Sequence, residues 1–185
     1  PMRCINHNCR LSGGGKAWNV IRFRRGADAR PGPRVPSPIR ISGEAGRDRA
    51  VLISRAALVL RDPEHPVAMM FVDSAFGSPI VERLKAMGFV NVEEIVFGGA
   101  SPDYHDFNMR AYMWRQTKEW LPRGAIAKDD TKLATDLVGP GYHLNTNSKL
   151  VIESKESMQK RGVASPDDGD GLALTFARVV APIRA

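Results

Sequence analysis

Four aspartates have the clearest capacity for chemistry in this sequence. Asp73 follows the apolar run of residues 67–72, and an ionised carboxylate at the end of a buried strand is costly unless a positive group meets it. Asp167, Asp168 and Asp170 gather at the start of the last predicted helix, whose spacing puts Asp167 and Asp170 on one face and Asp168 about 100° away. Two carboxylates from separate segments that meet at a sheet edge would suit Mg²⁺ or Mn²⁺, because hard cations take oxygen ligands.

Each of these aspartates also has a purely structural interpretation. Asp73 would cap the next turn by reaching the amides near Gly77, and acids in a first helical turn complement the helix dipole. Asp170 lies a full turn inside the helix, so the dipole explains it least, and its face is predicted to approach the sheet. Asp73 and Asp170 are therefore the strongest candidates, and in a basic protein they suggest phosphodiester hydrolysis.

The charge balance favours a polyanionic partner. The 185 residues contain 27 Lys and Arg against 20 Asp and Glu, for a net charge of +7. Cationic side chains gain affinity for nucleic acid by releasing counterions from phosphates, although a solvated basic surface would have the same composition. Nine arginines lie between residues 22 and 55, all within the first third of the chain: Arg22, Arg24, Arg25, Arg30, Arg34, Arg40, Arg47, Arg49 and Arg55. The sequence does not place them on one surface.

Other motifs lead to weaker hypotheses. The Gly-Gly-Gly-Lys run at 13–16 does not fit a nucleotide-binding loop, because Ala17 follows the lysine and Arg10 stands at the first glycine position. The two cysteines and His7 could supply three zinc ligands, but no second ligand pair follows at zinc-finger spacing. With only two cysteines, a reducing compartment without disulfides is the expectation. No apolar run approaches the ~20 residues that a membrane span needs.

The predicted elements belong to a single α/β domain. A composition of 43% hydrophobic and 25% charged residues is typical of globular proteins. A strand at 67–72, a helix beginning at Pro79 and a strand at 92–97 form a right-handed crossover unit. Around it we predict strands at 18–24 and 149–153, a long connection at 26–38, and helices at 47–60, 108–121, 131–138, 155–161 and from 165–167 to about 180.

Four segments make the sequence resemble the nuclease domain of a bacteriophage terminase large subunit, across most of its length. They are Phe71-Val72-Asp73 with Gly77, Asn108-Met109-Arg110 through Trp120-Leu121, Glu153-Ser154-Lys155-Glu156, and Ser165-Pro166-Asp167 through Ala177. The resemblance implies an RNase H-like mixed sheet flanked by helices. It also implies a DNA endonuclease that uses two Mg²⁺ or Mn²⁺ ions to hydrolyse phosphodiesters of double-stranded DNA during phage genome packaging.

The resemblance also implies a setting for the chain. Residues 1–185 would form a single nuclease domain without the N-terminal ATPase domain. The expected partners are double-stranded DNA, the terminase small subunit, the portal and a separate ATPase domain or chain. The expected location is the cytoplasm of the bacterial host, with no membrane contact.

Carried over residue by residue, the resemblance assigns site roles. Asp73 matches the acid after the central strand, Asp170 matches the acid of the closing helix, and Asp167 is a further metal ligand candidate. Lys155 matches the lysine of the family's Ser-Lys-Glu stretch, where it would meet a phosphate or the water beside the metals. Its alternative is an ordinary surface lysine at a helix start. Asn8 falls where the family has its first acid.

Asn8 is the departure with the largest consequence. Its neutral carbonyl oxygen would compensate clustered cations poorly, so metal binding should weaken and cleavage should be impaired. The start of the chain could also be a truncated or altered sheet edge. The main alternative is a catalytically inactive DNA-binding or assembly remnant of a prophage terminase. An RNase H-like resolvase or RNA nuclease is disfavoured by the 165–177 segment. Gly169 and Gly171 replace the family's usual alanines, each costing about 1 kcal/mol in a helix, and Tyr112 stands where an acid is common.

Overall fold

Five strands form the central sheet of the protein. The structure, a computed structural model, describes residues 4–8 and 18–181. The strands are β1 Cys4–Asn8, β2 Asn19–Arg24, β3 Ile39–Ile41, β4 Met69–Asp73 and β5 Val92–Ile95. Their order is β3-β2-β1-β4-β5, with antiparallel pairs on the β3-β2-β1 side and parallel pairs from β1 to β5. The predicted mixed α/β class and the parallel β4–α3–β5 unit are confirmed.

The strand β1 occupies the middle of this sheet. It pairs with β2 on one side and β4 on the other, with His7 opposite Ile21 and Val72. The expectation of an altered sheet edge at the start of the chain was therefore wrong, because edge strands have only one neighbour. A central position brings the end of β1 next to the end of β4.

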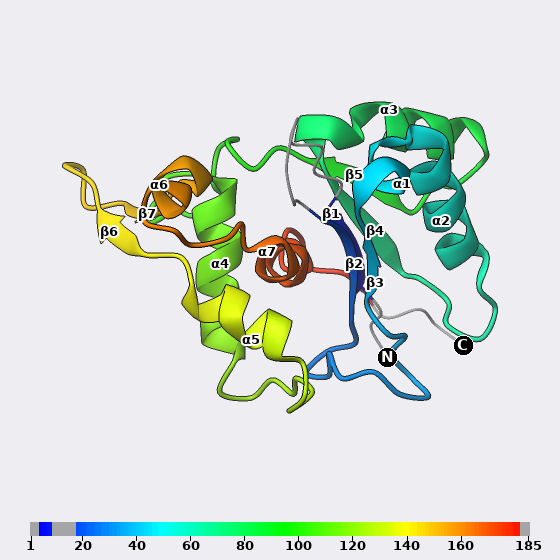
Figure 1. Cartoon of the computed structure of the whole chain (residues 1–185), viewed down its shortest axis with the longest axis horizontal. Coiled ribbons are helices and arrows are strands. Elements are labelled where there is room, and N and C mark those ends of the chain that lie inside the picture. The colour runs from blue at the N-terminus through cyan, green and yellow to red at the C-terminus, as the bar shows by residue number, and fades with distance from the viewer. Residues whose placement is uncertain (1–3, 9–17, 182–185) are drawn as a thin grey trace.

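Helices cover both faces of the sheet, as Figure 1 shows. On one face lie α1 Gly43–Arg47, α2 Arg49–Arg61 and α3 Ser74–Ala86. The strand β4 serves both layers, since Met70 and Val72 join the core under α2 and α3 while Phe71 joins the core under α4 and α7. The prediction that this apolar run is buried on both faces is confirmed.

The helix α3 begins earlier than predicted. Pro79 was expected as its first residue, but the side chain of Asp73 accepts the N–H of Ala75 at 3.2 Å and starts the helix at Ser74. Pro79 therefore lies inside the helix. At Gly77 a Cβ would overlap Cγ1 of Val72, so glycine lets α3 pack directly on β4.

The second layer contains the remaining helices and a hairpin. Its elements are α4 Met109–Trp120, α5 Thr131–Val138, α6 Lys155–Lys160, α7 Asp167–Leu174, β6 Tyr142–Leu144 and β7 Leu150–Ile152. The predicted strand at 149–153 exists as β7, but it pairs only with β6 and projects from the left of Figure 1. The strand β6 was not predicted because its residues are all exposed and do not alternate.

The helix α7 is shorter than predicted and ends at Leu174 instead of near residue 180. Two side chains use the atoms that would continue it. The hydroxyl of Thr175 donates to the carbonyl oxygen of Leu172 at 2.8 Å, and Arg24 Nη2 donates to the carbonyl oxygen of Thr175 at 2.9 Å. Among the described residues, no helix is long and apolar enough to cross a membrane.

Candidate active site

The helix α7 carries its acidic residues to two different sides. It packs on β1, β2 and β4 and lies beside α4 and α5 (Figure 1). Asp168 faces β2, whereas Asp167 and Asp170 both face Lys155 at the start of α6. The predicted sharing of one face by Asp167 and Asp170 is confirmed. The predicted approach of Asp170 to the sheet was wrong, since its polar contacts are with α4 and α6.

The Asp168 side is a network of two acids and two arginines, in which Asp168 and Arg22 are buried and Arg40 is exposed. Arg22 Nε donates to Asp168 Oδ1 at 2.7 Å, and Arg40 Nε donates to Asp168 Oδ2 at 3.0 Å. Both arginines also pair with Asp130, the N-cap of α5. Burial acts to raise the pKa of Asp130, but the hydrogen bonds and charge of Arg22 outweigh it and lower that pKa. The network is electrically neutral and fastens α5 and α7 to the sheet.

Asp136 from α5 caps the start of α7. Its Oδ2 accepts the N–H groups of Asp168 at 2.8 Å and Gly169 at 3.3 Å, where α7's own N-cap, Pro166, offers no side-chain acceptor. Burial raises the pKa of Asp136, although Lys132 donates to it at 2.8 Å. This close approach explains Gly169, where a Cβ would lie 2.9 Å from Trp114 Cη2. The glycine is a packing requirement of this chain.

The Asp170 side is also neutral but is bonded differently. Asp170 is fully buried, and its Oδ1 accepts from Trp114 Nε1 at 2.9 Å and from Arg110 Nε at 3.1 Å. Lys155 Nζ forms ion pairs with Asp170 Oδ2 at 2.7 Å and Asp167 Oδ1 at 3.2 Å. Lys155 is only 8% exposed, so its interpretation as a surface lysine was wrong.

Asp167 is held from several directions. Its Oδ2 accepts the backbone N–H of Trp18 at 3.0 Å, and its Oδ1 accepts from Ser165 Oγ at 2.6 Å. These contacts tie the start of α7 to the segment that enters β2. They give Asp167 a structural role, and its role as a metal ligand stays a prediction.

Two buried polar atoms on the Asp170 side make no hydrogen bond. Asp170 Oδ2 accepts none, although it is ion-paired with Lys155, and Arg110 Nη2 donates none. Within residues 18–181, the only other such side-chain atom is Asn19 Oδ1. Buried polar groups are normally hydrogen-bonded, so this acceptor, which contacts the Lys155 ammonium group, and this donor make the Asp170 side a candidate ligand site.

Asp73 and Asn8 stand at neighbouring strand ends. Asp73 is 4% exposed and ends β4; strand alternation directs it to the same face as Phe71, the face that α4 and α7 cover. His7 pairs with Val72, and Asn8 and Asp73 are the next residues along these parallel strands. The backbone thus places Asn8 beside Asp73. The side chain of Asn8 is not among those that the structure describes. The zinc hypothesis on Cys4, His7 and Cys9 also falls outside them.

The donor set fits a divalent cation in part. Asp73 and Asp170 supply hard oxygens from two elements, and Asp170 Oδ2 is a buried acceptor without a hydrogen bond. Against this, the described part of the chain contains no group of three or more His, Cys, Asp or Glu side chains placed to hold a metal. Asp170 and Asp73, with Asn8, would have to be completed by substrate or water.

Arg110 and Trp114 lie at the candidate site, but the sequence did not single them out as site residues. Both lie on α4, inside a segment that carries the family resemblance. Their spacing of four on one helix, with Asp170 opposite, is a signal that becomes readable only once α7 is known to pack on α4. Arg110 Nη1 donates to the carbonyl oxygen of Glu153 at 2.7 Å. It thereby joins Asp170 to the neighbouring hairpin.

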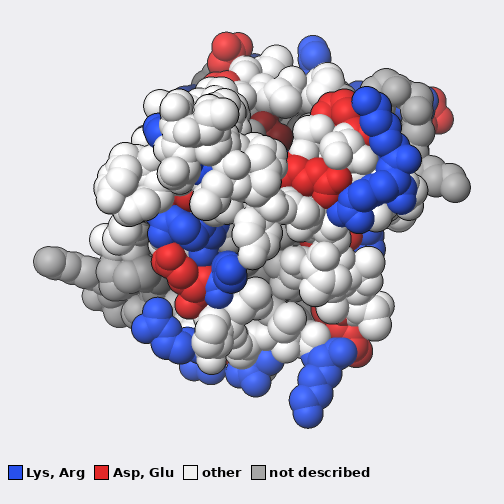
Figure 2. All heavy atoms as spheres, turned by 90° about the vertical axis from the view of Figure 1, so that its left-hand side faces the viewer, with Lys and Arg blue, Asp and Glu red and all other residues white. Residues whose placement is uncertain are grey.

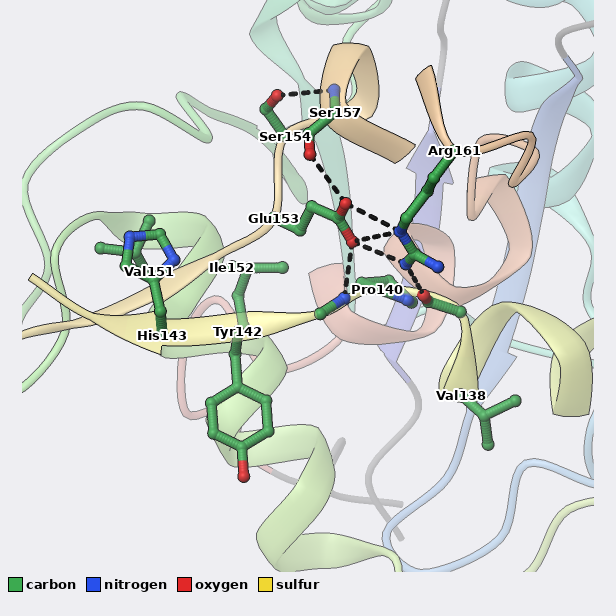
Figure 3. Close-up of a pocket in the computed structure, with 12 residues that line it drawn as sticks. Val138, Pro140, Tyr142, His143, Val151, Ile152, Glu153, Ser154, Ser157 and Arg161 are labelled. Carbon is green, nitrogen blue, oxygen red and sulfur yellow. Dashed lines mark hydrogen bonds and ion pairs between the residues drawn. The ribbon is translucent and has the colours of Figure 1, made fainter. Parts of the chain in front are cut away.

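A cavity of about 850 Å³ lies under that hairpin, between β6, β7 and α6 (Figure 3). The Glu153 carboxylate at its centre accepts from Arg161 Nη2 at 2.7 Å, from Ser157 Oγ at 2.8 Å and from the N–H of Gly141 at 2.8 Å. The Arg161 guanidinium and these donors lower the pKa of Glu153 to about 2. Glu153 therefore fastens the hairpin to α6.

Comparisons with known proteins agree on the fold. No protein-family model and no curated protein matches the sequence. Among solved structures, the nuclease domain of the large terminase subunit of bacterial virus Sf6 has a TM-score of 0.71 at 17% identity, covering 98% of this chain and 90% of that one. The large terminase nuclease of a thermophilic phage gives 0.63 at 16% identity, covering 96% and 82%. That of a Thermus phage gives 0.62 at 15% identity, covering 95% and 78%.

These similarities show that the chain has the fold of large terminase nuclease domains, as the sequence resemblance predicts. Structures of the Sf6 domain contain calcium or manganese, and those of the thermophilic phage nuclease contain magnesium or cobalt.

Proposed function

We propose that this chain is a metal-dependent DNA endonuclease domain of terminase type, with an RNase H-like arrangement, that acts on double-stranded DNA in phage genome packaging. The observation that carries the proposal is the pair of buried atoms without a hydrogen bond on the Asp170 side, which are Nη2 of Arg110 and Oδ2 of Asp170, the latter ion-paired with Lys155. One is suited to a cation and the other to a phosphate oxygen, and a phosphodiester with its divalent metal supplies both.

The residues would divide the work as follows. Asp73 and Asp170 would hold Mg²⁺ or Mn²⁺, which when bound supplies Lewis acidity toward the phosphate and its attacking water. Arg110 Nη2 would bind a phosphate oxygen while Nε keeps Asp170 in place. Trp114 Nε1 would fix the orientation of the Asp170 carboxylate. The ammonium group of Lys155 would offset the repulsion between the carboxylates of Asp167 and Asp170 until substrate arrives.

A second candidate is a DNA-binding remnant without turnover. Asn8 at the end of β1 favours it, because the backbone places an asparagine next to Asp73 where a third carboxylate would strengthen cation binding. The Lys155–Asp170 ion pair favours it too, since it neutralises the site without a metal. The two candidates differ in metal binding: the enzyme should bind Mn²⁺ through Asp73 and Asp170, and the remnant should not.

The test is cleavage of supercoiled plasmid DNA with Mg²⁺ or Mn²⁺ by three proteins: the wild type, Asn8→Asp and Asp170→Ala. Titration calorimetry with Mn²⁺ on the same proteins supplies a readout independent of turnover. We expect cutting that Asp170→Ala reduces at least ~100-fold, because loss of a ligand exceeds the effect of losing an outer-shell partner.

The three proteins separate the candidates. Cutting by the wild type but not by Asp170→Ala supports the enzyme and means that Asn8 is tolerated. Cutting by Asn8→Asp alone means that the site is correct and that Asn8 disables this copy. Absence of cutting and of Mn²⁺ binding in all three, with DNA still bound, supports the remnant.

A further inference from the structure

The arginines of the first third of the chain have different fates in the fold. Arg22 and Arg40 form ion pairs within the Asp168 network, and Arg24 donates a hydrogen bond to the hydroxyl of Thr175. Arg49 and Arg55 are exposed on α2, in the helix layer on the other face of the sheet from α7. Three others, Arg25, Arg30 and Arg34, line one cavity of about 370 Å³ in the segment between β2 and β3.

This cavity belongs to a well-fixed loop. The N–H of Ala29 donates to the carbonyl oxygen of Ala125 at 2.9 Å, and the N–H of Ala125 donates to that of Ala27 at 2.7 Å. Gly32 and Val35 exchange two further backbone hydrogen bonds, and Val35 is buried in the core. Prolines at 31, 33 and 36 restrict the rest of the segment. The cavity is therefore formed before any ligand arrives.

The charge of the cavity is unbalanced. Asp28 is its only acid, and Arg30 occupies it with bonds from Nε at 2.9 Å, Nη2 at 3.2 Å and the backbone N–H at 3.0 Å. Arg30 accordingly lowers the pKa of Asp28. Among residues 18–181, no carboxylate forms an ion pair with Arg25 or Arg34. Two guanidinium groups thus remain for an anion beside an apolar floor of Val35, Ala27 and Ala125.

We propose that the Arg25–Arg34 cavity binds a phosphate of the DNA backbone at a distance from the cleavage site. A planar guanidinium group can donate two parallel hydrogen bonds to the oxygens of one phosphate. Contacts of this kind with the DNA backbone position a duplex without reading its sequence. The proposal names a second contact with the substrate of the proposed function, and it rests on that function for the identity of the polyanion.

The position of the cavity suits a long ligand. Arg24 ends β2, whereas Asp73 ends β4, which runs the opposite way, so the cavity and Asp73 lie at opposite ends of the sheet. A six-residue strand spans about 20 Å, close to the length of six base pairs. Figure 2 shows Lys and Arg side chains along the lower edge of the face on which α4, α5 and the β6–β7 hairpin lie, and in Figure 1 both the loop before α5 and the segment after β2 lie at this lower edge.

The experiment is a binding titration of a fluorescein-labelled DNA duplex of about 20 base pairs, with EDTA present to prevent cleavage, over ~50 to ~200 mM salt. The test variant is Arg25→Gln with Arg34→Gln. The control is Arg49→Gln with Arg55→Gln, which removes the same charge from α2. The single variant Arg34→Gln changes only an exposed side chain, and thermal unfolding checks that each protein is folded.

We expect the test variant to bind DNA about tenfold more weakly at ~100 mM salt, and its slope of log affinity against log salt to flatten by about 1, the change for one lost phosphate contact. Arg34→Gln should show about half of that change in slope, and the control should change little. Equal effects in test and control variants would overturn the cavity as a site and leave only general charge.

Three further outcomes separate this proposal from others. Stabilisation of the wild type by millimolar inorganic phosphate, with DNA affinity unchanged in the test variant, assigns the cavity to a free anion and overturns the proposal. A wild type that binds no DNA overturns both the cavity proposal and the proposed function. Loss of DNA affinity in the test variant, in a chain that never cuts, supports the cavity and rejects the nuclease.

Discussion

The two sides of α7 carry the same charges but differ in how completely those charged groups are hydrogen-bonded. On one side Asp168 and Asp130 face Arg22 and Arg40, and on the other Asp167 and Asp170 face Lys155 and Arg110. Each side sums to zero. The first leaves no buried polar atom without a hydrogen bond, whereas the second leaves one acceptor and one donor open.

The two sides therefore share the same charge balance and differ in the completeness of their hydrogen bonding, which makes the Asp170 side the candidate for ligand binding. Asp168 and Asp170 are two residues apart and both fully buried. Helical geometry alone sends one to the sheet and the other to α4 and α6. A neutral, fully bonded network specifies structure, and a neutral but incompletely bonded one is ready for a ligand.

The largest effect that can test this comparison is on folding. Asp168→Ala should lower the free energy of unfolding by about 3–5 kcal/mol, because Arg22 stays buried with Asp130 as its remaining partner. Urea unfolding followed by circular dichroism measures it. Asp129→Ala, an exposed neighbour of Asp130, is the control and should change little. A small loss in Asp168→Ala would break the assignment of that side to structure.

The cap on α7 should give the next largest effect. Asp136→Ala removes the acceptor of two buried N–H groups and should cost about 1–2 kcal/mol of stability in the same assay. Asp136→Asn keeps a carbonyl oxygen at the same place and should lose much less. If both variants lose equally, the ion pair with Lys132 would matter more than the cap.

The Asp170 side should respond in chemistry more than in folding. Trp114→Phe removes one of the two donors to Asp170 Oδ1 and should reduce cleavage, or Mn²⁺ affinity where cleavage is absent, by about tenfold. Trp120→Phe is the matched change, because the Trp120 indole donates to Gly26 instead. Equal losses in the two variants would contradict a positioning role for Trp114.

The smallest effect concerns the hairpin beside that site. Glu153 has a pKa of about 2, lowered from 4.5, so its contribution to stability is present above about pH 4.5 and is lost as pH falls toward 2. Glu153→Gln should therefore be less stable than wild type by a constant amount at neutral pH, and the gap should close in that acidic range. Urea unfolding at several pH values measures the gap. Glu82→Gln, exposed on α3, should show none.

The sequence predicts the elements better than the relations between them. The apolar run before Asp73 and the helical segments at 108–121 and 155–161 are local signals, and the structure places β4, α4 and α6 accordingly. What the sequence misses depends on contacts between distant segments. Arg24 ends α7 from 151 positions away, and the sides taken by Asp168 and Asp170 depend on how α7 sits among α4, α6 and β2.

The same logic applies to the site. Asp73, Asp170 and Lys155 are found from the sequence because their segments carry the resemblance, and their metal-binding and catalytic roles stay predictions. Arg110 and Trp114 join the candidate site only through their hydrogen bonds to Asp170, 60 and 56 positions later, which no local pattern reveals. The burial of Lys155 cannot be predicted from its own segment. An ammonium group is stable in a core only where carboxylates pair with it, and those of Lys155 come from Asp167 and Asp170 on α7.

The central position of β1 and the packing of α7 on it have a consequence for biosynthesis. The strand and the helix come from opposite ends of the described chain, and Trp18 bonds to Asp167 across 149 positions. Contacts of such sequence separation form late and slow folding. On the ribosome, the candidate site therefore stays unassembled until α7 has emerged, because an unfinished chain lacks the contacts of α7 with β1, β2 and β4.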